Sequence, residues 1–155
     1  MTALTQLIGS EGRAQRAVSP SAVDTSFTLA TGGAAQAQLY DSNDTTPAAD
    51  SSGLTASTHA AYDFGAAKNI ARVRVITASA NGFGASGVFA IQYSDTNLTS
   101  GFTTATTITI NAGTSQSSDK QIGDFGAHRY WRIIYQSGTT GGNAWLGELT
   151  FYERY

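Results

Sequence analysis

The chain has 155 residues, a formal net charge of −2 and a pI near 5.5, which is the length of one ordinary domain. Its nine Lys and Arg residues are not clustered, so we do not expect nucleic acid as a partner, because binding a phosphate backbone needs several grouped cations. Cysteine is absent, which excludes disulfides, thiolate metal sites and a cysteine nucleophile.

The first twenty residues differ in character from the rest of the chain. Leu4, Leu7 and Ile8 give this segment weak helical periodicity, which ends at Ser19-Pro20. It lacks the basic start and apolar core of a signal peptide, and no segment approaches the roughly eighteen apolar residues of a membrane span. We predict an N-terminal arm over residues 1–20 and one domain over residues 21–155, with neither signal-directed export nor a membrane span.

From residue 25 onward, short apolar or alternating runs are separated by Gly, Asn, Ser and Thr. No stretch there keeps a 3.6-residue period, so the pattern is typical of an all-β sandwich. The predicted strands are 27–29, 35–40, 61–64, 70–77, 88–94, 104–110, 129–135 and 144–152. Residues 41–57 are predicted to form a loop and residues 65–69 a turn. About eight strands are expected for an antiparallel jelly roll.

The run RYWRIIY at 129–135 has large apolar residues on both faces, which favours a central strand. An arginine and aromatic ligand platform is the alternative, but burial of Trp131 in the core fits so apolar a segment better. We expect Arg129 or Arg132 to pair with a carboxylate near one end of the sandwich.

The stretch LYDSNDTT at 39–46 carries two carboxylates, an amide and three hydroxyls in a chain with few charges. Calcium takes six to eight oxygen ligands, which such a loop can supply in part. Asp and Asn also bond their own backbone and end strands without any ion. From these residues alone, a calcium loop and a polar turn both remain open.

Five segments together resemble, in order and spacing, the discoidin or coagulation-factor type C family of galactose-binding-like jelly rolls. They are LYDSNDTT (39–46), YDFG with KNIARVRV (62–75), FAIQYSD (89–95), RYWRI (129–133) and GELTFYE (147–153). The resemblance covers about residues 33–153 and implies a β-sandwich whose loops at one end bind carbohydrate without catalysis. It also implies a structural Ca²⁺, with its ligands falling on Asp41, Asn43, Asp44, Thr45 and Glu148. Where the family commonly has Gly and Trp, this chain has Ser42 and Thr46.

Trp145 directly follows a loop of Gly, Thr and Asn. An aromatic ring at a loop end can stack on a sugar while neighbouring amides bond its hydroxyls; packing at the edge of the core is the equal alternative. Further candidates for ligand contact are Asn143, Tyr40, His59, Phe83 and Asn81. Neither His59 nor His128 lies in a metal-ligand spacing, so satisfied histidines are the simpler interpretation of both.

We expect no enzymatic activity. The chain has no GxSxG elbow, and its only glutamates are Glu11, Glu148 and Glu153, which is poor material for a pair of catalytic carboxylates. A non-catalytic glycan-binding module is the first expectation. A purely structural capsid or tail protein is the alternative, and an accessory binding domain of a glycan-active enzyme is the third.

The composition of the chain, together with its arm, suggests the biological setting in which such a module works. A charge-poor, cysteine-free chain without a signal, with an arm and one glycan-binding-like domain, is similar to a phage or phage-like virion protein. Residues 1–20 would then anchor it to other virion subunits, as a homo-oligomer within the assembly, and its loops would face host glycans.

Overall fold

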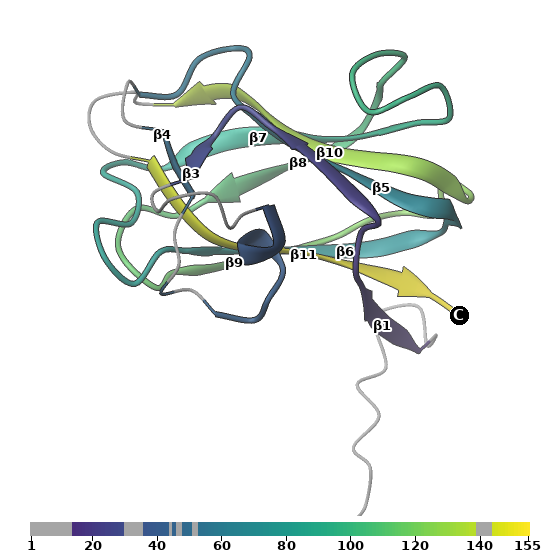
Figure 1. Ribbon diagram of the computed structural model, residues 1–155, viewed down its shortest axis with the longest axis horizontal. Helices are drawn as coiled ribbons and strands as arrows, with labels where there is room; N and C mark the ends of the chain where they lie inside the picture. Colours follow the sequence, from purple (N-terminus) through teal and green to yellow (C-terminus); the bar gives the residue numbers. More distant parts are fainter. Residues whose placement is uncertain (1–13, 30–35, 44, 46–47, 51–52, 139–143) are drawn as a thin grey trace, which may run out of the picture.

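The computed structural model describes residues 14–29, 36–43, 45, 48–50, 53–138 and 144–155. Two antiparallel sheets are stacked face to face in a sandwich (Figure 1). The strands are β1 (Gln15–Val18), β2 (Ala22–Thr25), β3 (Thr28–Leu29), β4 (Ala48–Asp50), β5 (His59–Lys68), β6 (Ile70–Thr77), β7 (Gly87–Ser94), β8 (Thr103–Ile110), β9 (Ser117–Gln121), β10 (His128–Gly138) and β11 (Ala144–Arg154). In this described part, no helix has the length and apolar character needed to cross a membrane.

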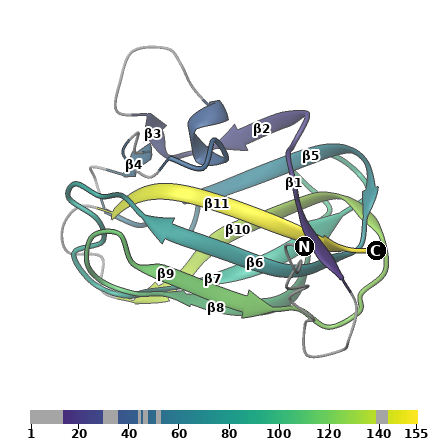
Figure 2. The same cartoon turned by 90° about the horizontal axis from the view of Figure 1, so that it is seen from below.

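The two long C-terminal strands are the centres of the two sheets. Sheet A has the order β3-β4-β11-β6-β9, and β1 also pairs with β11; sheet B has the order β2-β5-β10-β7-β8. Figure 2 shows β1 lying beside the end of β11 where the chain stops. The predicted all-β sandwich is confirmed.

The core lies between the sheets and is built from alternate residues of their inner faces. Trp131 is fully buried, as predicted; its ring is tilted against that of Tyr93, with centroids 5.5 Å apart, and its indole N–H donates to the carbonyl of His128 at 3.1 Å. Tyr62 and Phe151 pack against each other across the sandwich, with ring centroids 5.3 Å apart. Aromatic contacts between the inner faces therefore hold the two sheets together.

Three predicted elements differ in the structure, and one of them, the predicted loop 41–57, contains β4. Residues 36–39 form a 3₁₀ turn, η1 (Gln36–Leu39), rather than a strand, because Leu39 is buried and its carbonyl lies 3.2 Å from the Tyr62 hydroxyl instead of in a ladder. The predicted turn at 65–69 lies largely within β5, which continues through Gly65 at φ +72°. Asp63 Oδ1 accepts the N–H of Gly65 at 2.7 Å, so the strand continues past one glycine in the left-handed conformation.

Four short strands were not predicted: β1, β2, β4 and β9. The sequence of β9, SSDKQ, has no apolar residue, and only Ser118 in it is buried. Such strands form because a neighbour offers an open edge, here that of β6, and not because of their own pattern.

Candidate functional site

Three described loops meet at the end of the sandwich where β10 ends and β11 begins. We call this the loop end and define it by residues 53–58, 78–86 and 111–116 with Ala144 and Trp145. Phe83 and Gly113 exchange backbone hydrogen bonds of 3.1 and 2.8 Å, and the N–H of Trp145 donates to the carbonyl of Gly82 at 2.8 Å. A Cβ at Gly82 would lie 2.1 Å from the Gly113 carbonyl oxygen, so only glycine permits this close approach.

Trp145 and Asn81 are the two predicted ligand residues that the structure brings together. Trp145 is partly exposed, and its buried Nε1 has no hydrogen-bond partner among the described residues. Asn81 is exposed at φ +71° and directly precedes Gly82, the residue bonded to Trp145. A partly exposed tryptophan and an exposed asparagine on adjacent backbone segments are suitable residues for contact with a sugar ring and its hydroxyls.

The other candidates for ligand contact have different surroundings. Phe83 is 2% exposed and packs against Phe89, so its ring belongs to the core rather than to a binding surface. His59 has both ring nitrogens engaged, 2.7 Å from the Ser57 carbonyl oxygen and 3.2 Å from Asp24 Oδ2. Tyr40 packs edge-on against Tyr62. Asn143 lies outside the described residues.

The predicted metal ligands Asp41 and Glu148 come together from opposite ends of the chain. Glu148 is 3% exposed on β11, and its Oε1 accepts the N–H of Asn43 at 2.6 Å. The same N–H lies 2.8 Å from Asp41 Oδ1, and Ser42, at φ +65°, turns the loop between them. Asn43 Oδ1 in turn accepts from the N–H and hydroxyl of Thr45, at 3.1 and 2.6 Å.

Electrostatics at this pair are unfavourable for two negative charges. Burial raises the pKa of Glu148 to about 7, with a further contribution from the Asp41 carboxyl at hydrogen-bond distance, while the backbone N–H groups of Asn43 and Ser42 oppose the rise. A divalent cation between two carboxylates cancels the repulsion between their negative charges. The donor set of carboxylates, amide and hydroxyl oxygens fits calcium chemistry.

The polar-turn interpretation also has support from the same loop. The contacts of Asp41 with Asn43, and of Asn43 with Thr45, span two residues each, as in Asx turns. Within the residues that the structure describes, no group of three or more His, Cys, Asp or Glu converges. Asp44 lies outside those residues. The loop contacts therefore leave both interpretations open, and the approach of Glu148 is what favours the ion.

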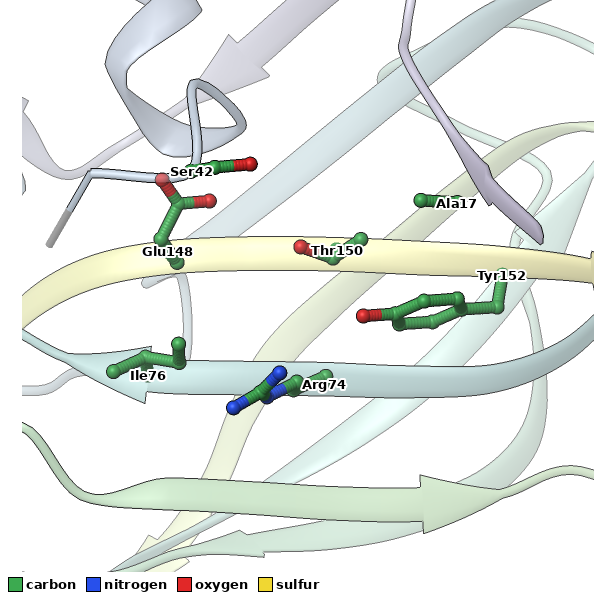
Figure 3. A pocket seen from close by; sticks show the side chains of 7 residues that line it. All are labelled: Ala17, Ser42, Arg74, Ile76, Glu148, Thr150 and Tyr152. Atoms are coloured by element: carbon green, nitrogen blue, oxygen red, sulfur yellow. The ribbon is translucent and has the colours of Figure 1, made fainter. Parts of the chain in front are cut away.

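Sequence reasoning did not identify a hollow on the outer face of sheet A. It encloses about 400 Å³ and is lined by Ala17, Ser42, Arg74, Ile76, Glu148, Thr150 and Tyr152 (Figure 3). Thr150 is the direct cross-strand partner of Arg74, and Glu148 is that of Ile76. The alternation within β6 and β11 signals that these residues share an outward face, but their proximity depends on the pairing of two strands that are about seventy residues apart.

Comparison with known proteins gives the fold a precedent. No protein-family model and no curated protein sequence matches the chain. Among solved structures, the family 32 carbohydrate-binding module of Clostridium perfringens NanJ, in complex with galactose, is 16% identical with a TM-score of 0.66, covering 90% of this chain and 99% of that one. The family 32 module of AlyQ, in complex with 4,5-unsaturated mannuronic acid, is 17% identical with a TM-score of 0.66, covering 88% and 97%.

Two further structures show how the fold is used in other contexts. The family 62 module of Clostridium thermocellum Xyl5A is 20% identical with a TM-score of 0.63, covering 90% of this chain and 97% of that one. A truncated AlyQ with its alginate lyase domain is 16% identical with a TM-score of 0.68, and the chain spans only 34% of its length. At these identities the likeness establishes the fold, and the predicted galactose-binding-like jelly roll is confirmed.

Proposed function

We propose that the chain is a non-catalytic carbohydrate-binding module that binds a neutral glycan at its loop end. The observation that carries the proposal is the hydrogen bond from the N–H of Trp145 to Gly82, the residue after Asn81, on backbone fixed by interloop hydrogen bonds. An aromatic face with adjacent amide groups is the usual chemistry of sugar recognition. The shared fold with modules solved in complex with sugars supports the same conclusion.

The absence of charge in the loop sequences defines the kind of glycan. Residues 53–58, 78–86, 111–116 and 139–143 contain no Asp, Glu, His, Lys or Arg. These loops hold no group for general acid or base catalysis, which supports binding without turnover. They also offer no counter-charge to a uronic acid or sulfated sugar, so hydroxyls, amides and aromatic faces must provide the affinity. Binding at this end should then depend little on salt.

The test is retention on neutral polysaccharides in affinity electrophoresis, with Trp145→Ala as the main variant. Loss of a stacking ring should weaken binding about tenfold or more. Asn81→Gly is a milder second variant that tolerates the positive φ. Phe125→Ala is the matched control, because Phe125 is an aromatic residue 39% exposed in the loop 122–127 at the opposite end. Retention lost in the control but kept in Trp145→Ala would move the site away from the loop end.

We also propose that Asp41, Asn43, Thr45 and Glu148, with Asp44 of the same loop, hold one structural Ca²⁺. Its support is the approach of two carboxyl groups at the buried Glu148. A bound ion would stabilise the connection between the 39–46 loop and β11, and would not itself contact the glycan. The stability test of this proposal is given in the Discussion.

The wider setting remains a proposal on the composition of the chain. We propose a virion component in which the N-terminal arm contacts other subunits and the loops face host glycans. Gln15–Val18 of that arm pair with β11 of the same domain, so a clean test removes residues 2–13 only. Loss of incorporation into particles, with glycan binding retained, is the expected result. Unchanged incorporation would favour the accessory domain of an enzyme, the arrangement seen in the AlyQ structure with its lyase domain.

A further inference from the structure

We propose that the hollow on the outer face of sheet A is a second sugar-binding subsite, which takes one neutral pyranose residue. It does not depend on the loop-end site. Along β11, Thr150 of the hollow is five residues from Trp145 and Glu148 is three residues from it, which are separations of roughly 17 and 10 Å in an extended strand. The two sites therefore bind separate sugar residues and can be tested separately.

Several hydrogen-bonding groups that line the hollow have no partner within the described part of the domain. Both described polar contacts of Arg74 use Nε, which donates to Ser117 Oγ at 3.0 Å and lies 3.9 Å from Asp119 Oδ2. Its two terminal amino groups have no partner among the described residues, and neither does the hydroxyl of Thr150 or of Tyr152. Figure 3 shows the side chains of Arg74 and Thr150 flanking the hollow from neighbouring strands.

The walls of the hollow are held in place by contacts outside it. The Tyr152 ring is stacked by Arg72, whose guanidinium carbon lies 3.7 Å from the ring centroid. The two residues are cross-strand partners, which fixes the phenol at one side of the hollow. At the other side, Glu148 is held by the backbone N–H of Asn43. A preformed wall reduces the entropy cost of binding.

The chemistry favours a neutral polyol over an acid or an apolar group. A sugar hydroxyl can accept from Arg74 and donate to Thr150 or Tyr152 at the same time. In the metal-free protein, a carboxylate ligand would satisfy Arg74 but would lie beside the carboxyl group of Glu148. An apolar ligand would find only Ala17 and Ile76. The volume of about 400 Å³ falls within the range of small-molecule sites, about 300–1,000 Å³.

The experiment is a two-dimensional ¹H–¹⁵N NMR titration of the full chain with the methyl glycosides of glucose, galactose, mannose and N-acetylglucosamine, and with glucuronate as the charged comparison. At least one neutral glycoside should shift the amides of Arg74 and Thr150 as well as those of the loop end. Arg74→Gln should weaken binding at the hollow about tenfold, the effect of losing a charge-assisted hydrogen bond. Thr150→Val should weaken it several-fold by the same reasoning.

The controls separate this site from the loop end. Neither hollow variant should change the Kd reported by loop-end amides, and Trp145→Ala should leave the hollow response intact. Thr109→Val, at an exposed threonine of β8 in the other sheet, should change nothing.

Several results would overturn the proposal. One is a response confined to the loop end, and another is a hollow response that persists in both hollow variants. Preference for glucuronate would contradict the neutral ligand. Shifts of the hollow amides on removal of residues 2–13, with no response to any sugar, would mean that the chain itself fills the hollow.

Discussion

Asp63 and Glu148 are two buried carboxylates with opposite electrostatic surroundings. Asp63 is 9% exposed and Glu148 is 3% exposed. Asp63 meets the guanidinium of Arg129 in two hydrogen bonds of 2.8 Å, which lower its pKa. Glu148 meets Asp41, and its pKa rises to about 7, mainly through burial. Burial raises the pKa of Glu148 because no cation of the described residues opposes it, whereas the hydrogen bonds from Arg129 outweigh the effect of burial on Asp63.

The difference teaches how to separate a structural carboxylate from a candidate ligand. Arg129 and the N–H of Gly65 complement Asp63, so it needs nothing from solution. Glu148 makes no ion pair within the described part of the chain, and a second carboxyl group approaches it. A bound cation would supply the positive charge for Glu148 that Arg129 supplies for Asp63.

Binding of calcium should produce the largest change in stability. With the ion bound, Glu148 would face a cation, as Asp63 does. At about 1,000 times its Kd, a single bound ion raises the free energy of unfolding by about 4 kcal/mol. Thermal unfolding with Ca²⁺ and with excess chelator measures this gain. Glu148→Gln should abolish most of it, and Asp63→Asn should leave it intact. Equal midpoints of the wild type with and without Ca²⁺ would rule out a tightly held ion.

The pH dependence of the metal-free protein should show the next largest effect. The folded pKa of Glu148 lies above its unfolded value of 4.5, so its contribution to stability is fully present below pH 4.5 and is lost as the pH rises through about 7. The loss is up to about 3 kcal/mol. The pKa of the facing Tyr62 is raised well above its usual value, so Tyr62 does not titrate in this window.

Urea unfolding between pH 4 and 8, in metal-stripped buffer, measures this loss. A plot of the free energy of unfolding against pH should be flatter for Glu148→Gln than for the wild type. Saturating Ca²⁺ should make the plot of the wild type flat as well. The same slope in wild type and variant would assign the pH dependence to other groups.

Asp63→Asn should show the smallest of the three effects, with the opposite pH dependence. It weakens the hydrogen bonds to Arg129, whose side chain is 47% exposed and hence screened, and a cost of about 1 kcal/mol at pH 7 is expected. The pKa of Asp63 is lowered, so its contribution is present above the unfolded pKa and is lost as the pH falls through the folded pKa. The gap between wild type and variant should therefore close in acid.

Asp95→Asn is the matched control for Asp63, because the Asp95 side chain is 64% exposed where it pairs with His128. Its effect on the midpoint of urea unfolding should be smaller. An equal effect of the two substitutions would show that burial of Asp63 adds nothing to its pairing.

The sequence predicted those parts of the fold whose residues carry their own pattern. The density of large apolar residues in 129–135 indicated the centre of sheet B, and Trp131 is buried there. The approach of Asp41 to Glu148 followed from the family resemblance, because no local periodicity links residues more than a hundred positions apart. The metal that they would share stays a prediction.

The remaining features could not be predicted because they depend on pairing between distant segments. β9 is polar and short, and forms on the open edge of β6. The hollow exists only because Thr150 lies opposite Arg74 in the ladder, and a shift of β11 by one residue would turn Thr150 into the core. Phe83 looked like a loop residue in sequence, but it is buried by its bridges to Gly113 and Ala144.

The pairing of β1 with the final residues of β11 determines how the domain can be presented. Gln15 lies opposite Arg154, so the chain enters and leaves the sandwich side by side, at the end farthest from Trp145 (Figures 1 and 2). A tether joined at Ala14 or after Tyr155 would hold the domain at this end and leave the opposite end, with Trp145, facing outward. Fusion to a fluorescent protein or a solid support at Ala14 or at the C-terminus should therefore leave access to the loops unobstructed.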